Sequence, residues 1–284
     1  MATTTRPRRP VSAPARLCSL AAVVICSASC LAAGPAGPST RPSPKAAASA
    51  PAPAATTAPA RSAVPAPPAA AAGKDLAPIP LELPQPKFIG TPKNLVGVRL
   101  KITEGPSMPR KPFLAPKGTC NLALKKPVTA SDGEPTIGTP DLVTDGQAEA
   151  GTESYVELGP GVQWVQIDLQ ALGTLYAVVV WHEHHQPVVY HDVVVQVADD
   201  KDFITNVRTL YNNDHDNTAG LGIGRDWEYL ETNEGLLVEA KGIRARYVRL
   251  YSNGSTSSDV NRYTEVAVFG LPAKADDKPP AGGQ

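Results

Sequence analysis

Cysteine is scarce in this sequence, with four in 284 residues, and three of the four lie within the first 30 positions. Cys120 therefore has no cysteine partner in the rest of the chain, which excludes an intrachain disulfide framework and a four-cysteine zinc site there. Aromatic residues are also few, 15 against 30 prolines. Because a proline-rich, aromatic-poor segment cannot build a hydrophobic core, the folded part must be shorter than the chain.

Acidic side chains are absent from residues 1–73, which hold seven of the 27 lysines and arginines. The remaining residues, 74–284, carry 20 basic and 27 acidic side chains. The protein has zero net charge because a basic N-terminal segment offsets an acidic remainder. Nucleic-acid affinity needs clustered cations that displace phosphate counterions. The charge distribution therefore predicts no nucleic-acid partner.

Residues 1–33 have the pattern of an export signal. Four arginines precede an apolar stretch over residues 17–25, which is too short to span a membrane but has the length of a signal-peptide core. A disordered basic terminus with a chance apolar run is the alternative. The pattern predicts a protein that is exported, either to a bacterial cell envelope or into the medium.

The end of this leader allows two kinds of processing. The four residues from Ser27 to Cys30 are similar to a bacterial lipobox, in which the cysteine is lipidated, although Ser27 stands where leucine is usual. Ordinary cleavage near Ala32 or Ala33 is the alternative, because small residues serve both routes. Lipidation of Cys30 would be the protein's membrane contact.

The next segments change composition in two steps. Residues 34–73 contain 16 alanines and 10 prolines and no aromatic residue, which predicts a disordered linker. Residues 74–117 keep nine prolines but add recurring Ile, Leu, Val and Phe, so we expect an extended arm lying on the folded domain. Continued disorder is the alternative, since proline removes backbone donors. Residues 272–284 are expected to be a disordered tail.

From about residue 118, short runs rich in Val, Ile and Tyr alternate with Gly, Asn and Asp clusters, as is typical of an all-β domain. Strands are expected over residues 162–169, 175–181, 188–198, 246–251 and 263–270. Because residues 176–181 are almost all apolar, that strand should be buried on both faces. Two packed antiparallel sheets would bury these runs.

A family resemblance rests on five pieces of this domain: residues 121–131, Asp145 with Gly146, and residues 164–169, 246–251 and 265–270. In order and spacing they resemble the discoidin, or coagulation-factor type C, family over about residues 118–271. The resemblance implies a jelly-roll β-sandwich of galactose-binding-like type, whose end loops bind sugars, lipids or protein surfaces. It implies a non-catalytic binding module, for carbohydrate above all, or an adhesive one.

The resemblance also implies a structural calcium site. Many sugar-binding members of the family hold Ca²⁺ with backbone carbonyls, an Asp before Gly and a Glu in the last strand, and Asp145 and Glu265 match the two side-chain positions. Oxygen ligands suit Ca²⁺, and Gly146 allows the loop to curl around it. An ordinary turn at Asp145 and an exposed strand residue at Glu265 form the alternative.

Four of the five histidines lie close together at the end of a predicted strand: His182, His184, His185 and His191. Residues two apart on a strand share a face, so His182 and His184 could ligate a transition metal with His191 or Asp192. A metal-dependent enzyme is therefore an alternative function. A polar turn is the simpler interpretation of the same residues. The sequence has no G-x-S-x-G elbow, and no catalytic residue is predicted.

Residues 212–227 form a long polar, glycine-rich stretch. They lack the glycine and the glutamate that a calcium-binding EF-hand loop requires. Sugar recognition uses an aromatic face for the ring and planar polar groups for its hydroxyls. We therefore predict six ligand-binding residues by their chemistry: His184, His185, Asp214, Arg225, Trp227 and Asn253. A structural module of the envelope that binds another protein is the remaining alternative.

Overall fold

The structure is a computed structural model that describes residues 75–88, 95, 98–100 and 109–273. The predicted leader, Cys30, the linker and all but the first two residues of the predicted tail lie outside these ranges. The strands are β1 (Leu76–Pro78), β2 (Leu114–Pro116), β3 (Cys120–Asn121), β4 (Val128–Ala130), β5 (Val156–Pro160), β6 (Gln163–His182), β7 (Val194–Ala198), β8 (Arg208–Asn212), β9 (Leu236–Ser252) and β10 (Val260–Leu271).

Every pairing between these named strands is antiparallel. In the described ranges the single helical element is a short 3-10 turn, η1 (Pro140–Thr144). None of these residues forms a helix with the length and hydrophobicity of a membrane span. The predicted all-β jelly-roll class is confirmed.

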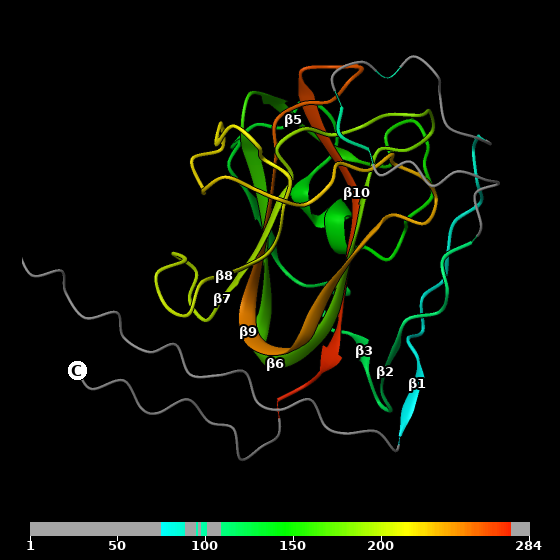
Figure 1. Ribbon diagram of the computed structural model, residues 1–284, viewed down its shortest axis with the longest axis vertical. Helices are drawn as coiled ribbons and strands as arrows, with labels where there is room; N and C mark the ends of the chain where they lie inside the picture. Colours follow the sequence, from blue (N-terminus) through cyan, green and yellow to red (C-terminus); the bar gives the residue numbers. More distant parts are fainter. Residues whose placement is uncertain (1–74, 89–94, 96–97, 101–108, 274–284) are drawn as a thin grey trace, which may run out of the picture. The chain divides into compact units, whose positions relative to one another are not determined.

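The two longest strands, β6 and β9, each run through both layers of the sandwich (Figure 1). Residues 163–168 of β6 pair with β4 and the end of β9, and residues 174–182 pair with β10 and the start of β9. The register shifts between Asp168 and Gly173, where Gln170 has φ 67°. Such irregularities bend a strand. The sequence predicted two separate strands here, and the structure joins them around a corner.

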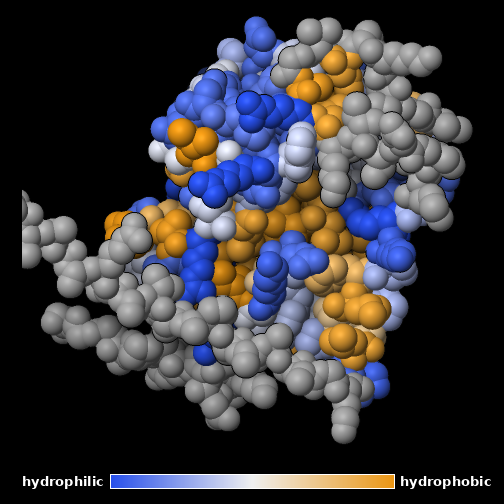
Figure 2. All heavy atoms as spheres, in the orientation of Figure 1, coloured by the Kyte–Doolittle hydropathy of each residue, from blue (hydrophilic) through white to orange (hydrophobic). Residues whose placement is uncertain are grey.

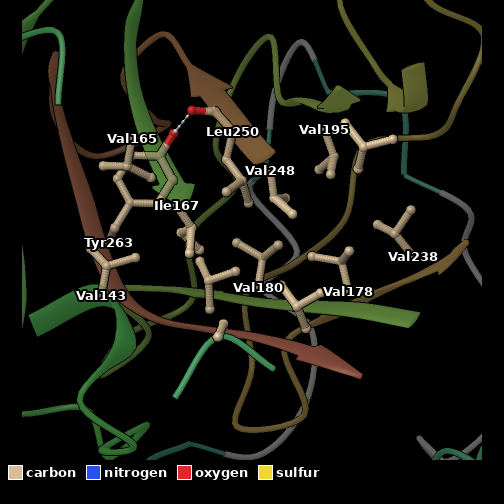
Figure 3. Packing of buried hydrophobic residues seen from close by; sticks show 14 of the residues in the cluster. Val143, Val165, Ile167, Val178, Val180, Val195, Val238, Val248, Leu250 and Tyr263 are labelled. Atoms are coloured by element: carbon tan, nitrogen blue, oxygen red, sulfur yellow. Dashed lines mark hydrogen bonds between the residues drawn. The ribbon is translucent and has the colours of Figure 1, made fainter. Parts of the chain in front are cut away.

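The main core lies between the two layers. Val165 and Ile167 from the first part of β6 face Val178 and Val180 from its second part (Figure 3). Val248 of β9 packs in the same cluster. Alternate residues along each of these strand segments point inward, as the period-two pattern of hydrophobicity predicts. The predicted strand over residues 188–198 is shorter than expected, because β7 begins only at Val194.

A second core lies on the outer face of one layer. It contains Ala177, Val179 and Trp181 of β6 with two residues of β10, and Ile79 and Ala115 pack on them from the arm. β1 and β2 pair with each other above this face. The predicted burial of residues 176–181 on both faces is thereby explained, since the arm covers the outer side.

The ribbon formed by β1 and β2 has a hydrophobic outer side. Leu76 is 51% exposed and Leu114 is 52% exposed. Figure 2 shows hydrophobic surface at the lower right, over these two strands. The ribbon therefore covers the sheet with one face and presents leucines to solvent with the other.

Three loops meet at one end of the sandwich. The amide of His191 donates to the carbonyl of Gly254 at 3.1 Å, and the amide of Asn253 donates back to the carbonyl of His191 at 2.9 Å. The amide of Glu231 donates to the carbonyl of Val188 at 2.8 Å. Residues 183–193, 213–235 and 253–259 are thus tied together, and all six predicted ligand-binding residues lie among them.

Candidate functional site

Asp192 is a junction between the loops at this end. Its backbone has φ 51°, a conformation that side chains other than glycine adopt uncommonly. Asn253 donates a hydrogen bond from Nδ2 to Oδ2 of Asp192 at 2.8 Å. Burial raises the pKa of Asp192, the negative charges of Asp214 and Asp216 raise it further, and the bond from Asn253 opposes them. Asn253 is therefore joined to the neighbouring loop by a bond to Asp192, a residue that was not in the predicted ligand set.

The carboxylates of Asp192, Asp214 and Asp216 have oxygens within 4.8 Å of one another, which is the one such three-residue group in the described part of the chain. Oxygens of this kind suit a hard divalent cation. Both oxygens of Asp214 nevertheless accept backbone amides, from Thr218 at 3.0 Å and from Ala219 at 2.9 Å. Asp214 is fully buried and its carboxylate holds the loop, so the structure places it inside the protein, and its predicted ligand contact stays a prediction.

Trp227 presents its indole to solvent and is 57% exposed. The Tyr211 hydroxyl donates to the Trp227 carbonyl at 2.6 Å. The preceding residue, Asp226, is bound twice to Asn212, through its amide at 3.0 Å and its carboxylate at 2.7 Å. The exposed indole therefore stands on a loop that is fixed to the end of β8. Arg225 is exposed on the same loop.

Glu228 links the tryptophan to the neighbouring loop. The carboxylate of Glu228 lies 3.3 Å from Nδ1 of His191, and Glu228 is only 9% exposed. Glu228 directly follows Trp227 in the chain, and hydrogen bonds connect Glu228 to His191, His191 to Asn253, and Asn253 to Asp192. We refer to the loops that carry Arg225, Trp227, His191, Asp192 and Asn253 as the rim assembly.

The two predicted histidines lie on the same loop as His191 but differ in exposure. His184 is fully buried, and its Nδ1 lies 2.9 Å from the carbonyl of His182. A ligand outside the protein cannot reach it, because the chain stays buried for two residues beyond the end of β6. The side chain of His185 is 56% exposed, but both its amide and its ring nitrogen bind the carboxylate of Glu183.

His182 belongs to a buried polar network. Its Nδ1 lies 2.6 Å from Oε1 of Glu231 and 3.1 Å from the hydroxyl of Tyr229, and its ring stacks on Tyr190 with centroids 4.2 Å apart. Burial and the charge of Glu231 raise the pKa of Tyr229. The sequence offered no sign of Glu231 as the partner, because it lies 49 positions away.

The alternative metal site, on His182 and His184 with His191 or Asp192, is not a three-ligand group in the described residues, where the one such group is Asp192, Asp214 and Asp216. The Nδ1 atoms of these rings face different partners, whereas Nε2 of His182 and Nε2 of His184 are buried and have no hydrogen-bond partner among the described residues. Nδ1 of His182 faces Glu231, Nδ1 of His184 faces a backbone carbonyl, and Nδ1 of His191 faces Glu228. The metal-dependent enzyme therefore stays an untested alternative.

Asp145 and Glu265 lie together at the outer face of the sandwich. The amide of Gly146 donates to Oε2 of Glu265 at 3.0 Å, and Gly146 has φ 89°. Glu265 is 2% exposed, so the alternative of an exposed strand residue is wrong. Burial raises the pKa of Glu265 to about 8, and the charge of Asp145 adds to this, while the Gly146 bond and Lys125 oppose it.

The chemistry of this pair fits a calcium ion. A buried carboxylate beside a second carboxylate is costly when both are ionised. A divalent cation between them would remove that cost. The fit rests on the burial of Glu265 and on the turn, both of which the structure shows.

No protein-family model and no curated protein matches this sequence. Among solved structures, the chain is similar to the CBM32 of AlyQ in complex with 4,5-unsaturated mannuronic acid, with 18% identity, TM-score 0.37, and coverage of 50% of this chain and 93% of that one. It is also similar to a Streptococcus pneumoniae fucose binding module, SpX-3, with 18% identity, TM-score 0.38 and coverages of 52% and 96%.

A third similar structure is chitosan-binding module 1 from a chitosanase/glucanase of Paenibacillus sp. IK-5, with 24% identity, TM-score 0.36 and coverages of 53% and 98%. Identities and scores this low transfer no ligand from one protein to another. The function must be argued from the residues of this chain.

Proposed function

We propose that this protein is a non-catalytic carbohydrate-binding module that holds its sugar at the rim assembly. The observation that carries the proposal is Trp227, an indole that is 57% exposed on a loop fixed by hydrogen bonds at both Asp226 and Glu228. An exposed aromatic face on a loop whose backbone is already fixed packs on the apolar side of a sugar ring at little entropic cost to the loop. Arg225, His191 and Asn253 supply planar polar groups for the hydroxyls.

The test compares Trp227→Ala with Ile204→Ala on a glycan array, followed by calorimetry with the best-retained glycan. Ile204 is a matched control, because it is 80% exposed on another loop. We expect Trp227→Ala to weaken binding by about 10-fold or more, which corresponds to the loss of roughly 1.4 kcal/mol. Equal affinities of the two variants would refute the role of Trp227. If the unmodified protein retains no glycan but captures an envelope protein, the structural-module alternative replaces this proposal.

We also propose that Asp145 and Glu265 hold a structural Ca²⁺ with nearby backbone oxygens. An ion that binds only the native state raises the melting temperature. Millimolar Ca²⁺ should therefore stabilise the unmodified protein relative to excess chelator, and Asp145→Asn should lose this gain. Glu153→Gln, an exposed substitution, is the control and should keep it. An unmodified protein that melts identically in Ca²⁺ and in chelator would overturn the calcium proposal.

The export of the protein is a further proposal, supported by the basic and apolar pattern of residues 1–33. We propose that the mature protein works in the cell envelope or outside the cell, and that the alanine- and proline-rich residues 34–73 connect it to an anchor at Cys30. Globomycin should block processing of the precursor, and Cys30→Ala should do the same. Normal processing in both cases would show ordinary cleavage and no lipid anchor.

A further inference from the structure

The loop that follows the exposed indole is held by the N-terminal arm as well as by the sandwich. We call residues 227–235 the Trp227 loop, and the arm is the described part of residues 75–117. The two meet at three points, at the beginning and at the end of the loop, although they lie more than 100 positions apart in the sequence.

The strongest contact is reciprocal and involves Arg110. Its backbone amide donates to both carboxylate oxygens of Glu234, each at 3.1 Å. Its guanidinium donates in the other direction, to the carbonyl of Glu234 at 2.8 Å and to that of Gly235 at 3.0 Å. Hydrogen bonds that involve a charged group are among the stronger ones in proteins. This arrangement therefore fixes the end of the loop to the arm.

The second contact lies next to it. Asn233 donates from Nδ2 to the carbonyl of Pro84 at 3.0 Å, while its own carbonyl accepts the indole N–H of Trp181 at 3.0 Å. Gly235 has φ 62°, and a Cβ there would lie 2.7 Å from the carbonyl oxygen of Val180. The end of the loop is thus seated between the sandwich on one side and the arm on the other.

The third contact is adjacent to Trp227 itself. The amide of Arg99 donates to Oε2 of Glu228, and Leu100 forms an isolated parallel bridge with Glu228. The other carboxylate oxygen of Glu228 faces His191 of the rim assembly. The buried carboxylate of Glu228, the residue after Trp227, therefore contacts both the arm and the loop that carries His191.

We propose that the arm is a working part of the sugar site: through Arg110 and Glu228 it positions the Trp227 loop and so sets ligand affinity without touching the ligand. The proposal rests on the proposed function. Arg110 and Glu228 are positioning residues, because they act through the loop. An arm that only covered the hydrophobic face would need its contacts with Trp181 and its neighbours, and would need none with the loop.

The test uses the full chain with Arg110→Ala, Arg110→Lys and Glu228→Gln. The control is Lys117→Ala, because Lys117 lies on the same arm in an ion pair with Asp75 whose partners are 67% and 75% exposed. Hydrogen exchange by mass spectrometry reports on residues 227–235 and, for comparison, on β10. Calorimetry with the glycan selected above reports on affinity.

We expect Arg110→Ala to speed exchange in residues 227–235 by about 10-fold, as the loss of two charged hydrogen bonds allows, and to leave β10 unchanged. Affinity for the glycan should fall by at least 3-fold, and Arg110→Lys, which keeps one donor group, should recover part of it. Glu228→Gln preserves volume and should act in the same direction if Arg110→Ala does not fold. Lys117→Ala should match the unmodified protein.

Two results would overturn the inference. Unchanged exchange in residues 227–235 for both Arg110→Ala and Glu228→Gln would show that the arm does not position the loop. Faster exchange with unchanged affinity would show that the position of the loop does not matter to the ligand. If the unmodified protein binds no glycan, the proposed function fails on its own, and the exchange experiment still decides whether the arm positions the loop.

Discussion

Replacing Glu265 by glutamine should stabilise the protein at pH 8 and leave it almost unchanged at pH 5, when Ca²⁺ is removed. The carboxyl group is 2% exposed, and its pKa is raised from 4.5 to about 8. Between these values the native state keeps a proton that the unfolded state has lost. The free energy of unfolding therefore falls as the pH rises from 4.5 to about 8 and is insensitive to this group outside that window.

The magnitude follows from the same two values. A pKa unit corresponds to about 1.4 kcal/mol, so the difference between 4.5 and about 8 corresponds to at most roughly 5 kcal/mol. Water entry and local relaxation around an ionised group reduce the cost, and we expect about 2 kcal/mol or more to appear experimentally. For a domain of this size that gain raises the melting temperature by about 4–8 °C. Glutamine carries no charge and can still accept the amide of Gly146.

The assay is urea unfolding followed by tryptophan fluorescence, in excess EDTA, at several pH values from 5 to 8. The quantity of interest is the difference between Glu265→Gln and the unmodified protein, because contributions from other titrating groups cancel in it. Glu153→Gln, which alters an exposed carboxylate, should show no comparable change. A difference that stays constant or shrinks as the pH rises would refute the reasoning from burial.

Three other substitutions test particular contacts. Gly235→Ala should cost about 2 kcal/mol or more in a thermal melt, because the backbone has φ 62° and the new methyl meets the indole of Trp181; a neutral result would contradict this geometry. Arg249→Ala should cost about 2 kcal/mol in urea, since the guanidinium stacks 4.0 Å from the ring centroid of Phe203; the idea fails if stability is kept. Asp168 accepts two 2.8 Å hydrogen bonds from Arg246, and these bonds lower the pKa of Asp168. Asp168→Asn removes this ion pair. The ion pair stabilises the protein by about 1 kcal/mol above pH 3.8, and this stabilisation is lost as the pH falls through the lowered pKa of Asp168, so a penalty that grows as the pH falls below 3.8 would count against it.

The sequence predicted those strands in which burial leaves a repeating pattern. Val165 and Ile167 alternate with more polar neighbours, and both are fully buried. The uninterrupted apolar run that ends at Trp181 correctly indicated a strand with two buried faces. Patterns of this kind are set by local geometry, which is why one sequence was enough to find them.

The remaining features depend on contacts between distant segments. Leu76–Pro78 and Leu114–Pro116 pair as strands of only three residues, too short to carry a periodic pattern. His184 looks like any polar loop residue, and its burial comes from the tertiary packing around it. At the candidate site the exposed indole of Trp227 was predictable by chemical type, whereas its link through Glu228 to His191 was not. Neither residue type nor spacing shows which loops converge.

The course of β6 and β9 through both layers has a consequence for how the protein unfolds. Both layers contain parts of β6 and β9, so one layer cannot unfold and leave the other intact (Figure 1). Opening near Val165 must pull on the same backbone that carries Val178. The sandwich should therefore melt as a single cooperative unit, with amides of both halves of β6 exchanging through one shared opening.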